Sequence, residues 1–191
     1  SYSGRRMTNH RPRNSIFHAF TVKYTGITNR LITEIGLRPA HDPSVPFSNL
    51  PPLYKTGALW DTGATASVIT QNTAQAMKLT PVGSTLVNHA GGTSPSRTYL
   101  VNITLPNNVN VAGVLVTECH DVAGNFGAII GMDIIAKGDF SLTCADGKST
   151  MSFRIPSISE IDYVKEADRI TYAGIGRNDP CPCGAKGNEE S

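Results

Sequence analysis

The segment 58–69 constrains the fold of this 191-residue chain more than any other stretch. Apolar residues lead to a single carboxylate, Asp61, which is followed by Thr62, Gly63 and the small Ala64 before a second apolar pair. This order is typical of a buried strand that ends in a tight loop, where a glycine lets the backbone turn without a Cβ in the way. Because a carboxylate at the end of a dry strand is costly, the pattern indicates that Asp61 has a chemical use.

Two further features follow in order. The segment 127–135, Gly-Ala-Ile-Ile-Gly-Met-Asp-Ile-Ile, is typical of an apolar strand that leads through a glycine into a short helix, and its Gly131 stands 70 residues after Asp61. Between the two lies His-Ala-Gly-Gly-Thr at 89–93, whose paired glycines suit the tip of a flexible hairpin. The alternative is that Asp61 caps a turn in an unrelated β-sandwich.

Together these features resemble the retropepsin-like, retroviral-type aspartic proteases in their bacterial form. The resemblance covers about 53–155. It implies an all-β fold, a closed β-barrel-like single lobe with a flap hairpin and short helices. It also implies that Asp61 is catalytic and that Thr62, Gly63 and Ala64 support its loop.

The resemblance further implies where a peptide would bind as an extended strand. The flap would contain Ala90, Gly91, Gly92 and Thr93. We expect apolar pocket walls, which would favour hydrophobic side chains at the cleavage site, from Val87, Ile129, Ile130 and Gly131.

Aspartic proteases need two carboxylates, one that takes a proton from water and one that donates a proton. This chain has a single Asp-Thr-Gly and is too short for a second lobe. We therefore expect an aspartic endopeptidase that is a homodimer and pairs Asp61 with Asp61 of a second chain. Ala64 cannot donate a hydrogen bond to the pair as a serine would, so we expect an optimum at weakly acidic pH.

Two other functions remain open. The chain could be a catalytically silent retropepsin-fold dimer that binds peptides or proteins. It could also be an adaptor that acts through its basic N-terminus and its cysteine-containing C-terminus, with the β body as a dimerising platform.

The composition limits the partners. The net charge of +2 gives no reason to expect a nucleic-acid partner, and no run approaches the 18 or so apolar residues of a membrane span. The arginines of 1–14 could attract RNA or acidic surfaces, but we expect this segment to be a disordered basic tail.

Alternating apolar residues predict strands on both sides of the Asp61 loop. We expect 15–52 to hold a hairpin, with strands near 20–24 and 31–37, and a proline-rich connector. The protease domain would span 53–155, with a helix capped by Thr70 and running to about Leu79. The Ser-Ile-Ser-Glu at 157–160 predicts a capping box and a helical segment over 156–172 with Ile158 facing inward.

The C-terminal segment 173–191 contains Cys181 and Cys183, and Gly176 to Gly184 resembles the opening of the zinc-binding SEC-C motif. The pair could supply two of the four zinc ligands, but the remaining two do not follow. We expect Cys119 and Cys144 to be buried free thiols, which argues for a reducing compartment and a cytoplasmic location. No cofactor is expected for catalysis.

Overall fold

The structure is a computed structural model that describes residues 5–10, 17–89, 92–120, 124 and 126–172. It divides into two compact units, Ser1–Ile158 and Ser159–Ser191. The hydrophobic core lies in the first unit, with members from Phe20 to Phe153. Phe20, Val22, Ile35 and Leu37 precede the expected protease domain of 53–155 but belong to the same core as Trp60, next to the Asp61 loop.

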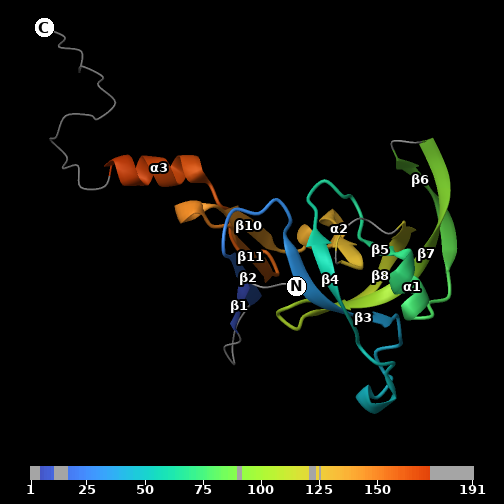
Figure 1. The fold of residues 1–191 in the computed structure, drawn as a ribbon. Coiled ribbons are helices and arrows are strands. Elements are labelled where there is room, and N and C mark those ends of the chain that lie inside the picture. The colour runs from blue at the N-terminus through green and yellow to red at the C-terminus, as the bar shows by residue number, and fades with distance from the viewer. Residues whose placement is uncertain (1–4, 11–16, 90–91, 121–123, 125, 173–191) are drawn as a thin grey trace, which may run out of the picture. The chain divides into compact units, whose positions relative to one another are not determined.

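The first unit is built around a closed barrel (Figure 1). One sheet has seven strands in the order β3 (Ile32–Pro39), β4 (Tyr54–Trp60), β9 (Ala128–Ile130), β5 (Val68–Thr70), β8 (Asn110–Cys119), β7 (Gly92–Thr104) and β6 (Gly83–His89). Because β3 also pairs with β7, six strands close into a ring and β6 lies outside it. The all-β, closed-barrel fold expected from the sequence is thus confirmed.

A second sheet has four strands in the order β1 (Arg5–His10), β2 (His18–Tyr24), β11 (Thr150–Ile155) and β10 (Asp139–Thr143). Two expectations were wrong here. The segment 5–10 is a strand paired with β2 and not part of a disordered tail. The strands β2 and β3 do not form a hairpin with each other, because β2 pairs with β11 and β3 pairs with β4.

The sequence places the helix after the Asp61 loop correctly. Helix α1 (Gln71–Ala76) begins at Thr70, whose side chain accepts a hydrogen bond from the Thr73 backbone N–H, as a capping threonine does. The helix ends about three residues earlier than expected, since Lys78 has a positive φ of 52° that no α-helix can continue. Helix α2 (Met132–Ile135) follows β9. Two 3₁₀ turns, η1 (Phe47–Asn49) and η2 (Ala145–Gly147), complete this unit.

The capping box expected at 157–160 does not form. The Ser157 hydroxyl donates instead to Asp139 Oδ1, and helix α3 (Tyr163–Tyr172) begins after Asp162, whose Oδ1 accepts the Val164 N–H at 3.0 Å. Ile158 is 41% exposed, so the inward-facing position expected for it is also wrong. Asp162 stands directly before the helix and caps it, whereas the Ser157 hydroxyl is engaged with Asp139.

Aromatic residues from both sheets form the centre of the core. Trp60 at the end of β4 packs against Phe20, Phe140 and Phe153, with ring centroids 5.0 to 6.1 Å away. The indole Nε1–H donates to the fully buried Thr33 Oγ1 at 2.9 Å. Trp60 therefore fixes the end of β4, the strand that delivers Asp61.

Cys119 and Cys144 are not the buried thiols that we expected. Cys144 is exposed and Cys119 is half-buried. Within the described part of the chain, no helix is long and apolar enough to cross a membrane.

Candidate active site

Asp61 lies directly after the last residue of β4. Its backbone N–H donates to the Ile130 carbonyl at 3.0 Å, which extends the parallel pairing of β4 with β9 by one step. Its side chain is half-buried, while Thr62 and Gly63 are exposed. The carboxylate thus stands where a dry strand meets the molecular surface.

The loop orients this carboxylate with its own backbone. Asp61 Oδ1 accepts a hydrogen bond from the Gly63 N–H at 2.9 Å, and the Asp61 carbonyl accepts one from the Ala64 N–H at 3.2 Å. A Cβ at position 63 would lie 3.2 Å from that same Oδ1, closer than most side-chain contacts. The short Asp-Thr-Gly turn therefore fixes one carboxylate oxygen against an amide.

Gly131, one of the residues that we expected to line the substrate pocket, is buried beneath the loop. A Cβ there would lie 2.6 Å from the carbonyl carbon of Ala66 and 2.9 Å from the carbonyl oxygen of Ala64. The absence of a side chain lets β9 and the loop approach each other. Gly131 has a structural role here, and its φ of −97° shows that space, not backbone conformation, requires glycine.

Two residues that sequence reasoning missed join the loop to α2. Ser67 is buried, and its hydroxyl donates to Asp133 Oδ1 at 2.8 Å and accepts from the Gly131 N–H at 3.1 Å. The signal that the sequence offered for Ser67 was its place as a small polar residue directly before the apolar pair Val68-Ile69.

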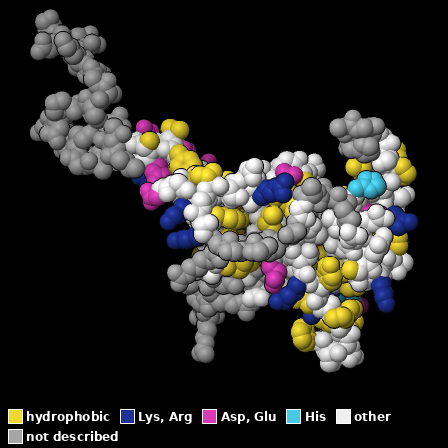
Figure 2. Space-filling model, viewed as in Figure 1, with side chains coloured by type: hydrophobic (Ala, Val, Ile, Leu, Met, Phe, Trp, Pro, Cys, Tyr) yellow, Lys and Arg dark blue, Asp and Glu magenta, His cyan; other side chains and the backbone are white. Residues whose placement is uncertain are grey.

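The hairpin expected to carry the flap is present as β6 and β7, which pair antiparallel from Gly83 opposite Thr98 to His89 opposite Gly92. Its tip residues Ala90 and Gly91 lie outside the described residues. Thr93 is exposed on β7. Figure 2 shows hydrophobic side chains on this hairpin, in agreement with the 71% exposure of Leu86.

The expected pocket walls are not brought together. Val87 lines a cavity of about 490 Å³ between the hairpin, the end of β8 and the start of α1. Ile130 is fully buried in the core and cannot form a wall of a substrate pocket, and Ile129 is half-buried.

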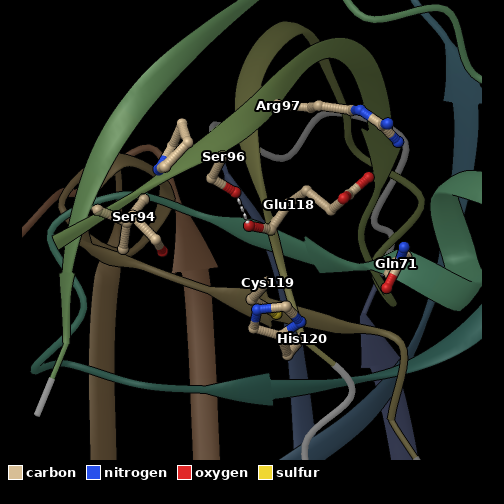
Figure 3. Close-up of a pocket in the computed structure, with 9 residues that line it drawn as sticks. Gln71, Ser94, Ser96, Arg97, Glu118, Cys119 and His120 are labelled. Carbon is tan, nitrogen blue, oxygen red and sulfur yellow. Dashed lines mark hydrogen bonds between the residues drawn. The ribbon is translucent and has the colours of Figure 1, made fainter. Parts of the chain in front are cut away.

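Polar residues from β7, β8 and α1 line the cavity beside Val87, although apolar atoms make up most of its surface (Figure 3). In this view Ser94 of the hairpin and Gln71 of α1 lie on opposite sides, with Cys119 and His120 between them. Glu118 also lines it and accepts a hydrogen bond from the Tyr99 hydroxyl at 2.5 Å. Burial and this contact raise the pKa of Tyr99, so the tyrosine stays protonated as a donor.

Cys181 and Cys183, the expected zinc ligands, lie outside the described residues. Among the residues that the structure describes, no group of three or more histidine, cysteine, aspartate or glutamate side chains could hold a metal ion.

Comparison with known proteins relates one part of the chain to a family. Residues 54–134, from the start of β4 into α2, match the model of a family described as "Aspartyl protease". No curated protein matches the chain. Among solved structures, a retropepsin-like aspartic protease from Rickettsia conorii aligns at 10% identity over 67% of this chain and 97% of that one, with a TM-score of 0.36. The segment that contains Asp61 is thus similar in sequence to the aspartyl protease family.

Proposed function

We propose that this protein is an aspartic endopeptidase that acts as a homodimer, with Asp61 of each chain forming one catalytic pair across a two-fold axis. One observation carries the proposal. Asp61 follows the buried Trp60 at the end of β4, its carboxylate accepts the Gly63 N–H, and Thr62 and Gly63 are exposed, all inside the segment that matches the aspartyl protease family.

The pairing supplies what a single loop lacks. Peptide hydrolysis requires a base to remove a proton from the attacking water and an acid to protonate the developing tetrahedral species. Two carboxylates held close together share one proton, so one acts as base and the other as acid. The exposed residues Thr62 and Gly63 leave the loop accessible to the same loop of a second chain.

In the reaction, one Asp61 carboxylate takes a proton from water as the oxygen attacks the peptide carbonyl carbon. The other, protonated Asp61 donates its proton to the carbonyl oxygen, which gives a neutral gem-diol. Collapse of this diol breaks the C–N bond, and the departing nitrogen receives a proton from the pair. Water is consumed and an acid and an amine are released, so the reaction needs no cofactor.

The substrate is proposed to be a peptide or protein segment bound as an extended strand, with its backbone paired to the protein. The hairpin of β6 and β7 is the proposed flap, because it is joined to the barrel through β7 alone and exposes Leu86. A hydrophobic residue next to the cleaved bond is the preference we propose to test first.

The chain offers a matched control for Asp61. Asp42 makes the same local turn, with Oδ1 accepting the Ser44 N–H at 2.8 Å, as Asp61 Oδ1 accepts the Gly63 N–H at 2.9 Å. Asp42→Asn and Asp61→Asn therefore change charge and local hydrogen bonding alike, at two different places.

The test is to incubate the wild type and both variants with a denatured protein mixture from pH 4 to 7.5, with and without a statine-type transition-state analogue, and to identify new peptides by mass spectrometry. We expect cleavage by the wild type and Asp42→Asn, none by Asp61→Asn, and suppression by the analogue. If neither the wild type nor either variant cleaves, while sedimentation shows a stable dimer, the result would instead indicate a peptide-binding module.

A further inference from the structure

The loop that carries Asp61 is tied to one short segment at three points. The Ile130 carbonyl accepts the Asp61 N–H at 3.0 Å, and the Met132 N–H donates to the Ala64 carbonyl at 2.8 Å. Between them, the Gly131 N–H donates to Ser67 Oγ at 3.1 Å. Three consecutive residues thus hold the loop: Ile130 holds its start at Asp61, Met132 its middle at Ala64, and Gly131 its end at Ser67.

The bond between Gly131 and Ser67 differs from the other two because its acceptor is a side chain. Ser67 is 1% exposed, and its hydroxyl donates its only proton to Asp133 Oδ1 at 2.8 Å. With the proton committed to Asp133, a lone pair of Oγ faces the Gly131 N–H. Asp133 therefore sets the direction in which the serine hydroxyl points.

Asp133 contributes to this arrangement as the acceptor for the Ser67 hydroxyl, and its negative charge is not required. An asparagine offers the same Oδ1 to the Ser67 hydroxyl, while an alanine offers nothing. Without the acceptor, the hydroxyl is free to rotate. Gly131 is itself buried, so loss of an oriented partner for its N–H leaves a costly unsatisfied donor that the loop can relieve by moving.

We infer that Ser67 and Asp133 are positioning residues for the reaction, which act together by holding the Asp61 loop against Gly131. This inference rests on the proposed function. Neither residue is proposed to touch substrate. Because a displacement of about 1 Å at a reacting group can cost about a hundredfold in rate, loss of the tie should lower kcat about ten- to a hundredfold. KM should change little, since the hairpin and not this tie is proposed to hold the peptide.

The experiment compares Asp133→Asn, Asp133→Ala, Ser67→Ala and the double alanine variant in the full chain. We expect Asp133→Asn to retain most of kcat, to within about threefold, because it keeps the acceptor. Both single alanine variants should lose kcat at nearly constant KM, and the double variant should be no worse than the more affected single one, since both remove one tie. Wild-type kcat in Asp133→Ala, or equal loss in Asp133→Asn and Asp133→Ala, would overturn the inference.

A second readout does not depend on cleavage. Amide hydrogen exchange at Asp61 and Met132 should be faster in Asp133→Ala than in Asp133→Asn. The Asp61 N–H bonds to Ile130 and the Met132 N–H bonds to Ala64, and both bonds lose the support of the neighbouring bond between Gly131 and Ser67. The Asn108 N–H, which bonds to Leu105 in a different turn, is the internal reference and should not change. If the wild type cleaves nothing while this difference is seen, the proposed function fails and the tie stands. Equal exchange at Asp61 in the two variants would refute the tie itself.

Discussion

The backbone N–H of Asp61 donates to the carbonyl of Ile130 at 3.0 Å, so the proposed catalytic residue is registered against β9 by the sheet itself. The strands β4 and β9 end together, because their last residues, Trp60 and Ile130, lie opposite each other. The position of the carboxylate is therefore set by the barrel and only its direction by the loop.

The first prediction concerns Gly131. A Cβ at this position would meet the backbone of Ala66 at 2.6 Å, which cannot move as a flexible side chain does. Gly131→Ala should therefore destabilise the protein by about 1–3 kcal/mol and lower activity by displacing the Asp61 loop. Gly26→Ala is the control, because a Cβ there meets nothing within 4 Å. Urea unfolding gives the stabilities, and equal midpoints for the two variants would contradict the packing described.

A second prediction tests the bond between Trp60 and Thr33. Trp60→Phe removes the Nε1–H donor and leaves the fully buried Thr33 hydroxyl without it, which should cost about 1–3 kcal/mol beyond any loss of ring packing. Thr33→Val removes the acceptor and leaves the indole N–H unsatisfied. The double variant should be more stable than the sum of the single effects predicts, and strict additivity in urea unfolding would count against the bond.

The third prediction concerns pH and Asp139. Hydrogen bonds from the Ser157 hydroxyl and the Ile158 N–H, with the Arg154 guanidinium, lower the pKa of Asp139 from 3.8 to about 2. A pKa depressed by folding stabilises the folded state at pH values above the unfolded pKa, and this contribution is lost as pH falls through the folded pKa. Asp139→Asn should thus be less stable than the wild type at pH 7, and the difference should shrink between about pH 4 and 2. A difference that stays constant down to pH 2 would refute the assignment.

A fourth prediction concerns the C-terminal unit. Among the residues that the structure describes, all core members precede 158, so a chain of residues 1–158 should fold and unfold cooperatively with nearly the midpoint of the full chain. It should also retain peptidase activity, since the proposed chemistry uses Asp61 alone and not Cys181 or Cys183. Loss of activity with an unchanged urea midpoint would assign the segment after 158 a role in catalysis or dimer formation.

Local features were predictable where one short segment determines the result. The strand at 128–130, the Thr70 cap and the loop after β4 follow from glycine, threonine and apolar residues at fixed positions. The Asp146-Gly147 turn, an Asp-Gly pair of the kind that favours hairpins, joins β10 to β11 with positive φ values of 53° and 69°.

Long-range partners could not be predicted in this way. The pairing of β2 with β11 joins residues more than 120 positions apart. The alternation of apolar and polar residues in either strand does not identify its partner strand. The partners of Ser67 and Thr33 were missed for the same reason. A small polar side chain shows its role only when the residue packed against it is known.

The most direct test of the account is to mix chains. Wild type unfolded together with an equal amount of Asp61→Asn and refolded should show about half the activity of the same amount of wild type refolded alone, since random pairing leaves about half of the wild-type chains in wild-type dimers. Wild type mixed with an equal amount of Asp42→Asn should give about twice the activity of the wild type refolded alone, because every dimer then keeps both Asp61 carboxylates. Full wild-type activity in the presence of the Asp61→Asn chain would show that each chain acts alone and would contradict the shared pair.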